Sequence, residues 1–203
     1  VAMAVLTLPT SPGLASLSPR LVTTRGELRG ATGASLQRVG RTGSRWAIDG
    51  ELPAMGHAAA LAWVDLFAEV DTCVLEVPEP GVTMGTPGTP LVNGAGQTGS
   101  SLFTDGWIPG YTIVKGKWFS VSCTVGGVAS LYFYQVRSAV TANGAGQATL
   151  AIRPMLRASP ADNAALNFNP AKIEGFITLG DGAMKITADR LMKGCSFSIE
   201  EWR

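Results

Sequence analysis

Turn-forming residues divide the chain between residues 100 and 156 into short segments. Of all sequence features, this division most restricts the possible fold, because it leaves room only for short secondary-structure elements in this region. Within each segment, apolar or aromatic residues tend to alternate with polar ones, as they do along half-buried β-strands. The segments are residues 100–106, 111–114, 117–123, 129–140 and 147–156. Short strands with this punctuation predict a small β-barrel, of which the five-stranded OB type is one candidate.

Residues 53–71 are the one stretch with clear helical periodicity. The apolar positions that recur at near-helical spacing are Leu61, Trp63, Val64, Phe67 and Val70. We expect this stripe to lie on a sheet, with Asp65, Glu69 and Asp71 as the polar edge of the helix. Short strands broken by glycine are predicted before the helix, at residues 20–28, 34–40 and 44–52.

A Gly/Pro/Thr connector at residues 83–90 is the best candidate for a domain boundary. A polar connector follows the barrel segments, and three more predicted strands close the chain. The most economical arrangement returns these last strands to the first sheet. The predicted organisation is therefore a larger domain of residues 1–82 plus 166–203, with its helix at about residues 55–70, into which residues 83–165 are inserted as the barrel.

The glycines of residues 94–99 have the G-x-G-x-x-G spacing that binds a dinucleotide pyrophosphate in Rossmann enzymes. That use requires a helix opening at the last glycine, and residues 100–110 contain too many glycines and prolines for one. The pentapeptide NGAGQ recurs at residues 143–147, where its Asn-Gly pair predicts a hairpin turn with positive φ angles. Both copies are predicted to be turns, with no bound nucleotide and no cofactor.

Groups that could perform catalysis are few. His57 is the single histidine, and no G-x-S-x-G motif is present to place a serine near it. We expect His57 to face solvent in the first turn of the helix. Cys73, Cys123 and Cys195 lie far apart without a C-x-x-C pair, which predicts reduced and partly buried thiols. No catalytic residue and no enzymatic activity are predicted.

The acidic residues form no D-x-D-x-D motif, and with one histidine and isolated cysteines no metal site is predicted. The acidic candidates are Glu76 with Glu79, Asp162, and Glu200 with Glu201. We expect these carboxylates to be solvated rather than to form an acid/base pair of the glycosidase type.

Charge is sparse and nearly balanced along the chain. The formal net charge of +1 gives no reason to propose nucleic acid or an anionic membrane as a partner. Six arginines within residues 1–50 are scattered and are expected on a solvated or interface face. Charged residues make up 15% of the chain, below the roughly 25% of soluble domains, which suggests that partner subunits cover much of the surface. No apolar run approaches the ~20 residues that span a bilayer, and we expect a soluble chain without a signal peptide.

Aromatic residues concentrate in the predicted barrel. Trp107, Tyr111 and Trp118 are the candidates for stacking on a ligand such as a host saccharide, if their rings are exposed. The plainer alternative is that these rings fill the interior. The Tyr-Phe-Tyr run at residues 132–134 is likewise expected to alternate, with both tyrosines on one face and the phenylalanine on the other.

Four stretches of the chain form a combined pattern when they are taken in order. They are a G-x-RW strand with an L-P segment (38–55), a helix of the A-x-x-W-x-x-F type (57–70), a turn-rich segment (88–107 with 114–121) and a G-x-A-T-L-x-I-x-P-x-LR run (144–166). Together they cover most of the chain. In this order they resemble distal tail proteins, the baseplate ring components of long-tailed bacteriophages.

The resemblance implies a mainly β fold: a β-sandwich carrying one α-helix, with an inserted small OB-like β-barrel. It also implies a structural virion protein, assembled in the host bacterial cytoplasm. This protein would form a homohexameric ring between the tail tube protein and the tail hub or tip protein and enclose the DNA channel. No active-site residues carry over.

Five positions match those that recur in distal tail proteins, and we expect them to serve folding or ring contacts. They are Arg45, Trp46, Pro154, Leu156 and Arg157. The alternative function is a carbohydrate-binding module of a phage tail that contacts the host surface through the barrel aromatics.

Overall fold

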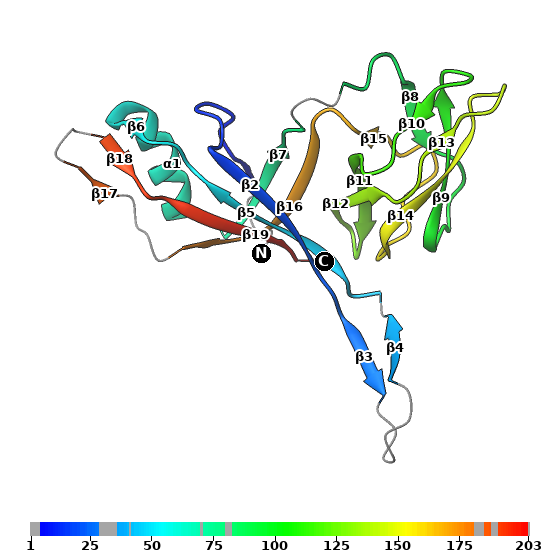
Figure 1. Cartoon of the computed structure of the whole chain (residues 1–203), viewed down its shortest axis with the longest axis horizontal. Coiled ribbons are helices and arrows are strands. Elements are labelled where there is room, and N and C mark those ends of the chain that lie inside the picture. The colour runs from blue at the N-terminus through cyan, green and yellow to red at the C-terminus, as the bar shows by residue number, and fades with distance from the viewer. Residues whose placement is uncertain are drawn as a thin grey trace.

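The structure is a computed structural model that describes residues 5–28, 36–40, 42–69, 71–79, 83–180, 185–187 and 191–202. Among these residues 55% lie in strands and 7% in a single helix. The prediction of a mainly β protein with one helix and a barrel is therefore confirmed. Figure 1 shows two bodies side by side, with a narrow hairpin projecting away from both.

The first body, which we call the sheet body, is built on a six-stranded sheet. In spatial order its strands are β1 (Leu6–Thr7), β7 (Thr72–Val77), β16 (Ala171–Leu179), β19 (Ser196–Glu201), β5 (Arg45–Glu51) and β2 (Ser16–Val22). β1 pairs with β7 in parallel, and the other pairs are antiparallel. Because β7 and β16 pair directly, the chain leaves this sheet for the second body and returns to the neighbouring position.

The helix α1 (His57–Glu69) belongs to the sheet body, together with a small sheet of β17 (Lys185–Ile186), β18 (Leu191–Lys193) and β6 (Met55–Gly56). Trp63 is fully buried and stacks on Phe197 of β19, with ring centroids 6.1 Å apart. Gly50 on β5 makes this packing possible, because a Cβ there would lie 2.8 Å from the Phe197 ring. No helix in the described part of the chain has the length and apolar character needed to cross a membrane.

The buried side of α1 differs from the predicted stripe. Ala60 and Trp63 are fully buried and Leu66 and Phe67 pack partly against the same core, so the buried side runs through i, i+3, i+6 and i+7. Leu61 and Val64 were expected in the stripe, but they are 43% and 37% exposed. The prediction was wrong for these two because the side of the helix that packs on the core is the one with Ala60, Trp63 and Leu66. Val70 lies outside the described residues.

The second body is a nearly closed barrel. Its strands, in spatial order, are β15 (Leu166–Asn167), β11 (Trp118–Val125), β12 (Val128–Val136), β14 (Ala148–Leu156), β9 (Gly99–Trp107) and β8 (Gly88–Val92). A bridge between Leu91 and Ala165 brings the first and last strands together. The barrel thus has six strands, one more than the OB type. β10 (Thr112–Ile113) and β13 (Val140–Thr141) form a separate short pair.

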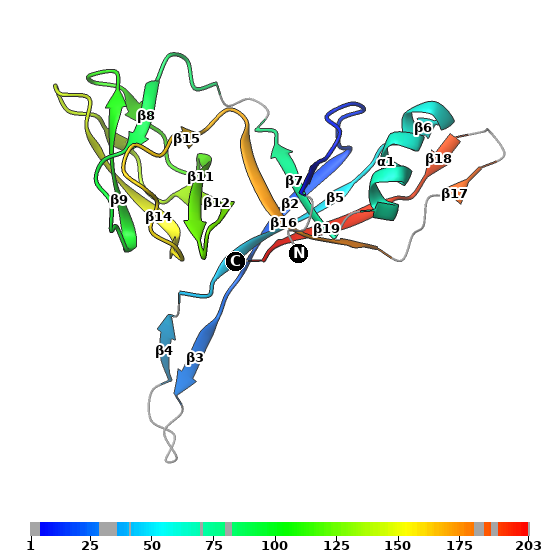
Figure 2. The ribbon, with the colours of Figure 1, turned by 180° about the vertical axis from the view of Figure 1, so that it is seen from behind.

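The barrel has its own hydrophobic cluster, whose residues run from Met84 to Phe168. The division of the chain at residues 83 and 165 stays a prediction. Figure 2 shows the barrel and α1 at opposite sides of the six-stranded sheet.

Both copies of NGAGQ are turns, as predicted. The first joins β8 to β9 in an antiparallel hairpin, so the strand–helix unit of a Rossmann site does not form. The side chain of Gln97 fastens this loop by accepting the N–H of Phe103 at 2.7 Å and donating to the carbonyl of Asn93 at 2.8 Å. In the second copy the positive φ lies at Gly146, whereas the predicted Asn-Gly pair has none. Asn143 acts through its side-chain oxygen, which accepts two backbone N–H groups of the turn.

A two-stranded hairpin of β3 (Arg25–Leu28) and β4 (Gln37–Gly40) continues from β2 and β5; we call these strands the arm. The sequence predicted one strand over residues 20–28, and the structure instead breaks it after Val22. The arm projects beyond both bodies (Figure 1).

Candidate functional site

The three aromatic residues predicted to stack on a ligand contact other side chains of the chain instead. Trp107 is 3% exposed, and its indole N–H donates to Thr104 at 2.8 Å. Tyr111 stacks on Trp107 with ring centroids 5.7 Å apart, and its hydroxyl donates to the carbonyl of Met84 at 2.5 Å. Trp107 lies in the barrel core and the partly buried Tyr111 packs against that core, so each ring already has a ring partner in the chain, and saccharide stacking on them stays a prediction.

Trp118 occupies a different place, at the junction between the two bodies. It lies on β11, yet it stacks on Phe133 at 4.8 Å and meets Trp46 of β5 edge-on at 4.4 Å. Phe133 is fully buried in the cluster of the sheet body, whereas Tyr132 and Tyr134 belong to the cluster of the barrel. The predicted alternation of residues 132–134 is therefore confirmed, and it lets one barrel strand contribute to both cores.

The edge of β12 that faces the sheet body lacks a strand partner over part of its length. β12 pairs with β14 only through Gln135 with Arg153 and Val136 with Ile152. The next residue of β14 is Pro154, which has no N–H to continue the ladder. The backbone N–H groups of Leu131 and Phe133 are therefore left for other acceptors, which the sheet body provides.

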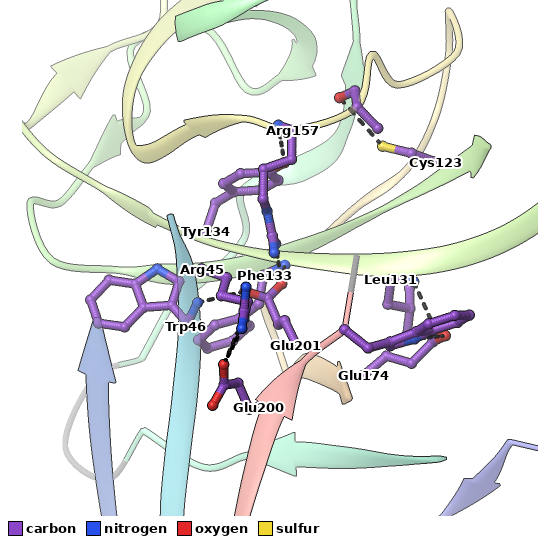
Figure 3. A network of polar contacts seen from close by, with 12 residues as sticks. Arg45, Trp46, Cys123, Leu131, Phe133, Tyr134, Arg157, Glu174, Glu200 and Glu201 are labelled. Carbon is purple, nitrogen blue, oxygen red and sulfur yellow. Dashed lines mark hydrogen bonds and ion pairs between the residues drawn. The ribbon is translucent and has the colours of Figure 1, made fainter. Parts of the chain in front are cut away.

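Glu201, near the end of β19, is the principal acceptor. Its carboxylate is 2% exposed and accepts the N–H of Phe133 at 2.8 Å and the N–H of Trp46 at 2.7 Å (Figure 3). It also forms a buried ion pair with Arg157, which follows β14. One carboxylate thus joins the sheet body to two elements of the barrel.

Arg157 contacts the tyrosine rings of the barrel on one side and the carboxylate of Glu201 on the other. The side chain is 6% exposed, and its guanidinium lies 5.0 Å from the ring centroid of Tyr132 and 6.0 Å from that of Tyr134. A cation over an aromatic face is stabilised by the ring quadrupole, more so when both are desolvated. The guanidinium therefore connects the barrel core to the carboxylate of Glu201.

Two further carboxylates make the same kind of contact. Glu174 of β16 is 6% exposed and accepts the N–H of Leu131 at 2.8 Å. Glu79, after β7, accepts the N–H of Trp118 at 2.9 Å and pairs with Lys117, which is 3% exposed. We call Glu79, Glu174 and Glu201 with their partners the carboxylate junction. It satisfies buried backbone donors that would otherwise destabilise the fold.

Burial controls the electrostatics of the junction. It raises the pKa of Glu201 above its usual value, and the charge of Arg157 and the two backbone donors oppose this. Burial also raises the pKa of the Tyr134 hydroxyl, so this group stays neutral at physiological pH. A carboxylate with two backbone donors and a guanidinium has few positions left for a substrate, so the junction is a structural joint.

The five positions that were predicted to serve folding or ring contacts lie at or next to this joint. Trp46 donates its backbone N–H to Glu201, and its indole N–H to the carbonyl of Arg153 at 3.3 Å. Arg45 pairs with the half-exposed Glu200 at 2.5 Å, Pro154 ends the β12–β14 ladder, and Leu156 is buried in the barrel cluster. Their placement agrees with the expectation of a role in folding.

The sequence-based expectation of solvated acids was wrong for Glu79 and Glu201. Their partners are distant in sequence: Glu201 binds Phe133 across 68 residues and Trp46 across 155. One signal was available, because Glu201 is in phase with Phe197 and Ile199, the inward-facing residues of β19. An acid in phase with a buried strand face indicates a buried acceptor.

A second unusual feature is apolar surface on α1 and on the arm. The outward face of α1 carries Leu61, Val64 and Ala68, at i, i+3 and i+7, and all three are exposed. On the arm, Leu28 is 59% exposed and Val39 is 44% exposed. We call these two surfaces the helix face and the arm face.

Other residues with potential chemistry do not form a site. His57 is exposed at the start of α1, as predicted. Cys73, Cys123 and Cys195 are free and buried, and burial raises the pKa of Cys73 to about 12 and of Cys123 to about 11. Among the described residues, no three His, Cys, Asp or Glu side chains come together in a way that could hold a metal ion.

A scan against protein-family models finds no family that matches the chain, and a search of curated proteins finds no significant match. The case for a function therefore depends on the carboxylate junction, the two apolar faces and the resemblance of the sequence segments.

Proposed function

We propose that this chain is a structural subunit of a bacteriophage tail. In this proposal it is a distal tail protein, which forms a homohexameric baseplate ring between the tail tube protein and the tail hub or tip protein. The ring encloses the channel through which DNA passes. The chain acts in the virion by symmetric association and has no catalytic step.

One observation carries the assembly role: α1 and the arm present apolar residues to solvent at different ends of the sheet body. A helix that is apolar on its outward side as well as its inward side is typical of a buried helix. An isolated two-stranded hairpin is marginally stable in water, and Leu28 and Val39 add no stability to the arm while they stay exposed. Both features favour a chain that is completed by further copies or partners.

The carboxylate junction supports the same proposal in a different way. In the proposed ring, a fixed angle between barrel and sheet would give every subunit the same shape. Three carboxylates on backbone donors, with Phe133 and Trp118 inserted into the sheet body, fix the barrel on the sheet. Each of these hydrogen bonds requires a particular geometry, so together they favour one orientation of the barrel on the sheet.

Electron microscopy tests the proposal directly. Purified protein at high concentration, or mixed with its tube partner, is expected to form sixfold rings in negative stain. Gold-labelled antibody against the chain is expected to mark the junction between tube and tip in virions. Virions with no label at that junction would contradict the tail function, and a neighbouring tape-measure gene would be a further expected finding.

A further inference from the structure

The helix face and the arm face cannot cover each other within one chain. α1 lies at one end of the sheet body and the arm projects from the other, in both views of the molecule (Figures 1 and 2). Any contact between them has to join two copies. A contact between two different surfaces is heterologous, and repetition of such a contact leads to a ring or a filament.

The arm is amphipathic, which gives it one side suited to docking. In its register Leu28 lies opposite Gln37 and Val39 opposite Gly26, so these four positions share one side. The other side carries Glu27 and Arg38, which form an ion pair at 3.1 Å. The arm therefore carries charged groups on one side and apolar groups on the other, and Leu28 and Val39 on the apolar side are exposed.

The two segments that carry these faces differ in net charge. Residues 23–44, which include the arm, contain four arginines and one glutamate. Residues 57–71, which include α1, contain Asp65, Glu69 and Asp71 but no lysine or arginine. Asp65 is exposed and follows Leu61 by four residues, so it lies beside the apolar stripe. The opposite net charges of the two segments favour the arm as the occupant of the helix face, whereas a second helix face would bring the Asp65 carboxylates of two copies together.

We infer that the arm of one copy packs on the outward face of α1 of the next copy, with Leu28 and Val39 against Leu61 and Val64. This contact rests on the proposed ring, because it is taken to repeat around a closed assembly. It names the surfaces by which neighbouring subunits recognise each other.

Engineered cysteines test the contact between the two faces. Val39→Cys and Val64→Cys, made in separate copies and mixed under mild oxidation, are expected to give a disulfide-linked dimer. The native thiols do not interfere, because all three are buried and burial raises the pKa of each of them. The matched control replaces Val64→Cys with Val128→Cys, a barrel residue that is 47% exposed. No cross-link with Val64→Cys, or an equal yield with Val128→Cys, would overturn the inference.

A mixing experiment tests the heterologous character. Val39→Asp and Val64→Asp are each expected to weaken self-association by at least about tenfold. A one-to-one mixture of the two variants is expected to recover dimers, because the intact arm of one variant meets the intact helix face of the other. Val128→Asp is the control and is expected to associate like the unmodified chain. Failure of the mixture to recover dimers, while each variant keeps the unfolding midpoint of the unmodified chain, would contradict the contact.

The results separate this inference from the proposed function. Sixfold rings without the Val39–Val64 cross-link would overturn the arm contact and leave the ring in place. A cross-link in a chain that is missing from the tube–tip junction of virions would keep the contact and contradict the tail function.

Discussion

The carboxylate junction buries acidic side chains, whereas the two apolar faces expose hydrophobic side chains. The junction buries Glu174 and Glu201 and supplies each with donors from the same chain. The helix face and the arm face expose Leu61 and Leu28 and supply them with no cover. The barrel is attached to the sheet by contacts within one chain, whereas the outer faces of the sheet body expose apolar surface that, in our proposal, association covers.

The largest effect is expected from removing the central acceptor of the junction. Glu201→Ala leaves the Arg157 guanidinium buried without its partner and removes the acceptor of two backbone N–H groups. Breaking a buried pair from one side costs about 3–5 kcal/mol, and we expect a loss of that size in the free energy of unfolding measured with urea.

The neighbouring residue gives a matched control. Glu200 pairs with Arg45 in a half-exposed position, so Glu200→Ala is expected to cost no more than about 1 kcal/mol. Equal losses for Glu200→Ala and Glu201→Ala would remove the distinction between the junction and ordinary surface pairs.

A smaller loss is expected at the second acceptor. Glu174→Ala removes the acceptor of the Leu131 N–H but leaves no buried cation behind. An unsatisfied buried donor costs about 1–3 kcal/mol. We expect Glu174→Gln to recover part of this loss, since the amide oxygen can still accept. No difference between the Ala and Gln variants in urea unfolding would mean that the hydrogen bond does not stabilise the junction.

The junction also predicts a pH dependence. Burial raises the pKa of Glu201, so between the usual value near 4.5 and the raised value the folded chain holds a proton that the unfolded chain has released. The stability contributed by this group therefore falls as the pH rises through that window. We expect the unmodified chain to lose stability relative to Glu201→Gln as the pH increases from about 4.5. A difference that grows in favour of the unmodified chain would contradict the sign.

The smallest effect on folding is expected at the helix face. Leu61→Ser changes a side chain that is 43% exposed and outside the buried line of α1. We expect the free energy of unfolding of the monomer to change by less than about 0.5 kcal/mol. Ala60→Ser provides the contrast, because Ala60 is fully buried and a hydroxyl there lacks a solvent partner. A large loss for Leu61→Ser would mean that this face is part of the folded core rather than a surface for association.

The strands and turns could be predicted from the sequence because their signals are local. Alternation correctly placed Phe133 on one face of β12 and Tyr132 and Tyr134 on the other, and the repeated NGAGQ marked two turns. The helix was placed correctly between residues 57 and 69, but its faces were not. Apolar residues occupy most positions around the helix apart from Asp65 and Glu69, so periodicity could not decide which apolar line contacts the sheet.

The junction could not be predicted in the same way, because its contacts join distant parts of the chain. Glu201 looked like a terminal surface acid, and only the end of the β12–β14 ladder at Pro154 explains why backbone donors are available to it. The arm was missed for a related reason. Residues 20–28 read as one alternating strand, and nothing local showed that the sheet body ends at Val22.

Cryo-electron microscopy of the assembled tail tests the account most directly. If the chain is the proposed ring subunit, we expect six copies of it at the junction between tube and tip, with the arm of each copy against the helix face of the next and the carboxylate junction intact in every copy. A junction without this chain, or a ring in which Leu61 and Val64 of α1 face solvent, would contradict it.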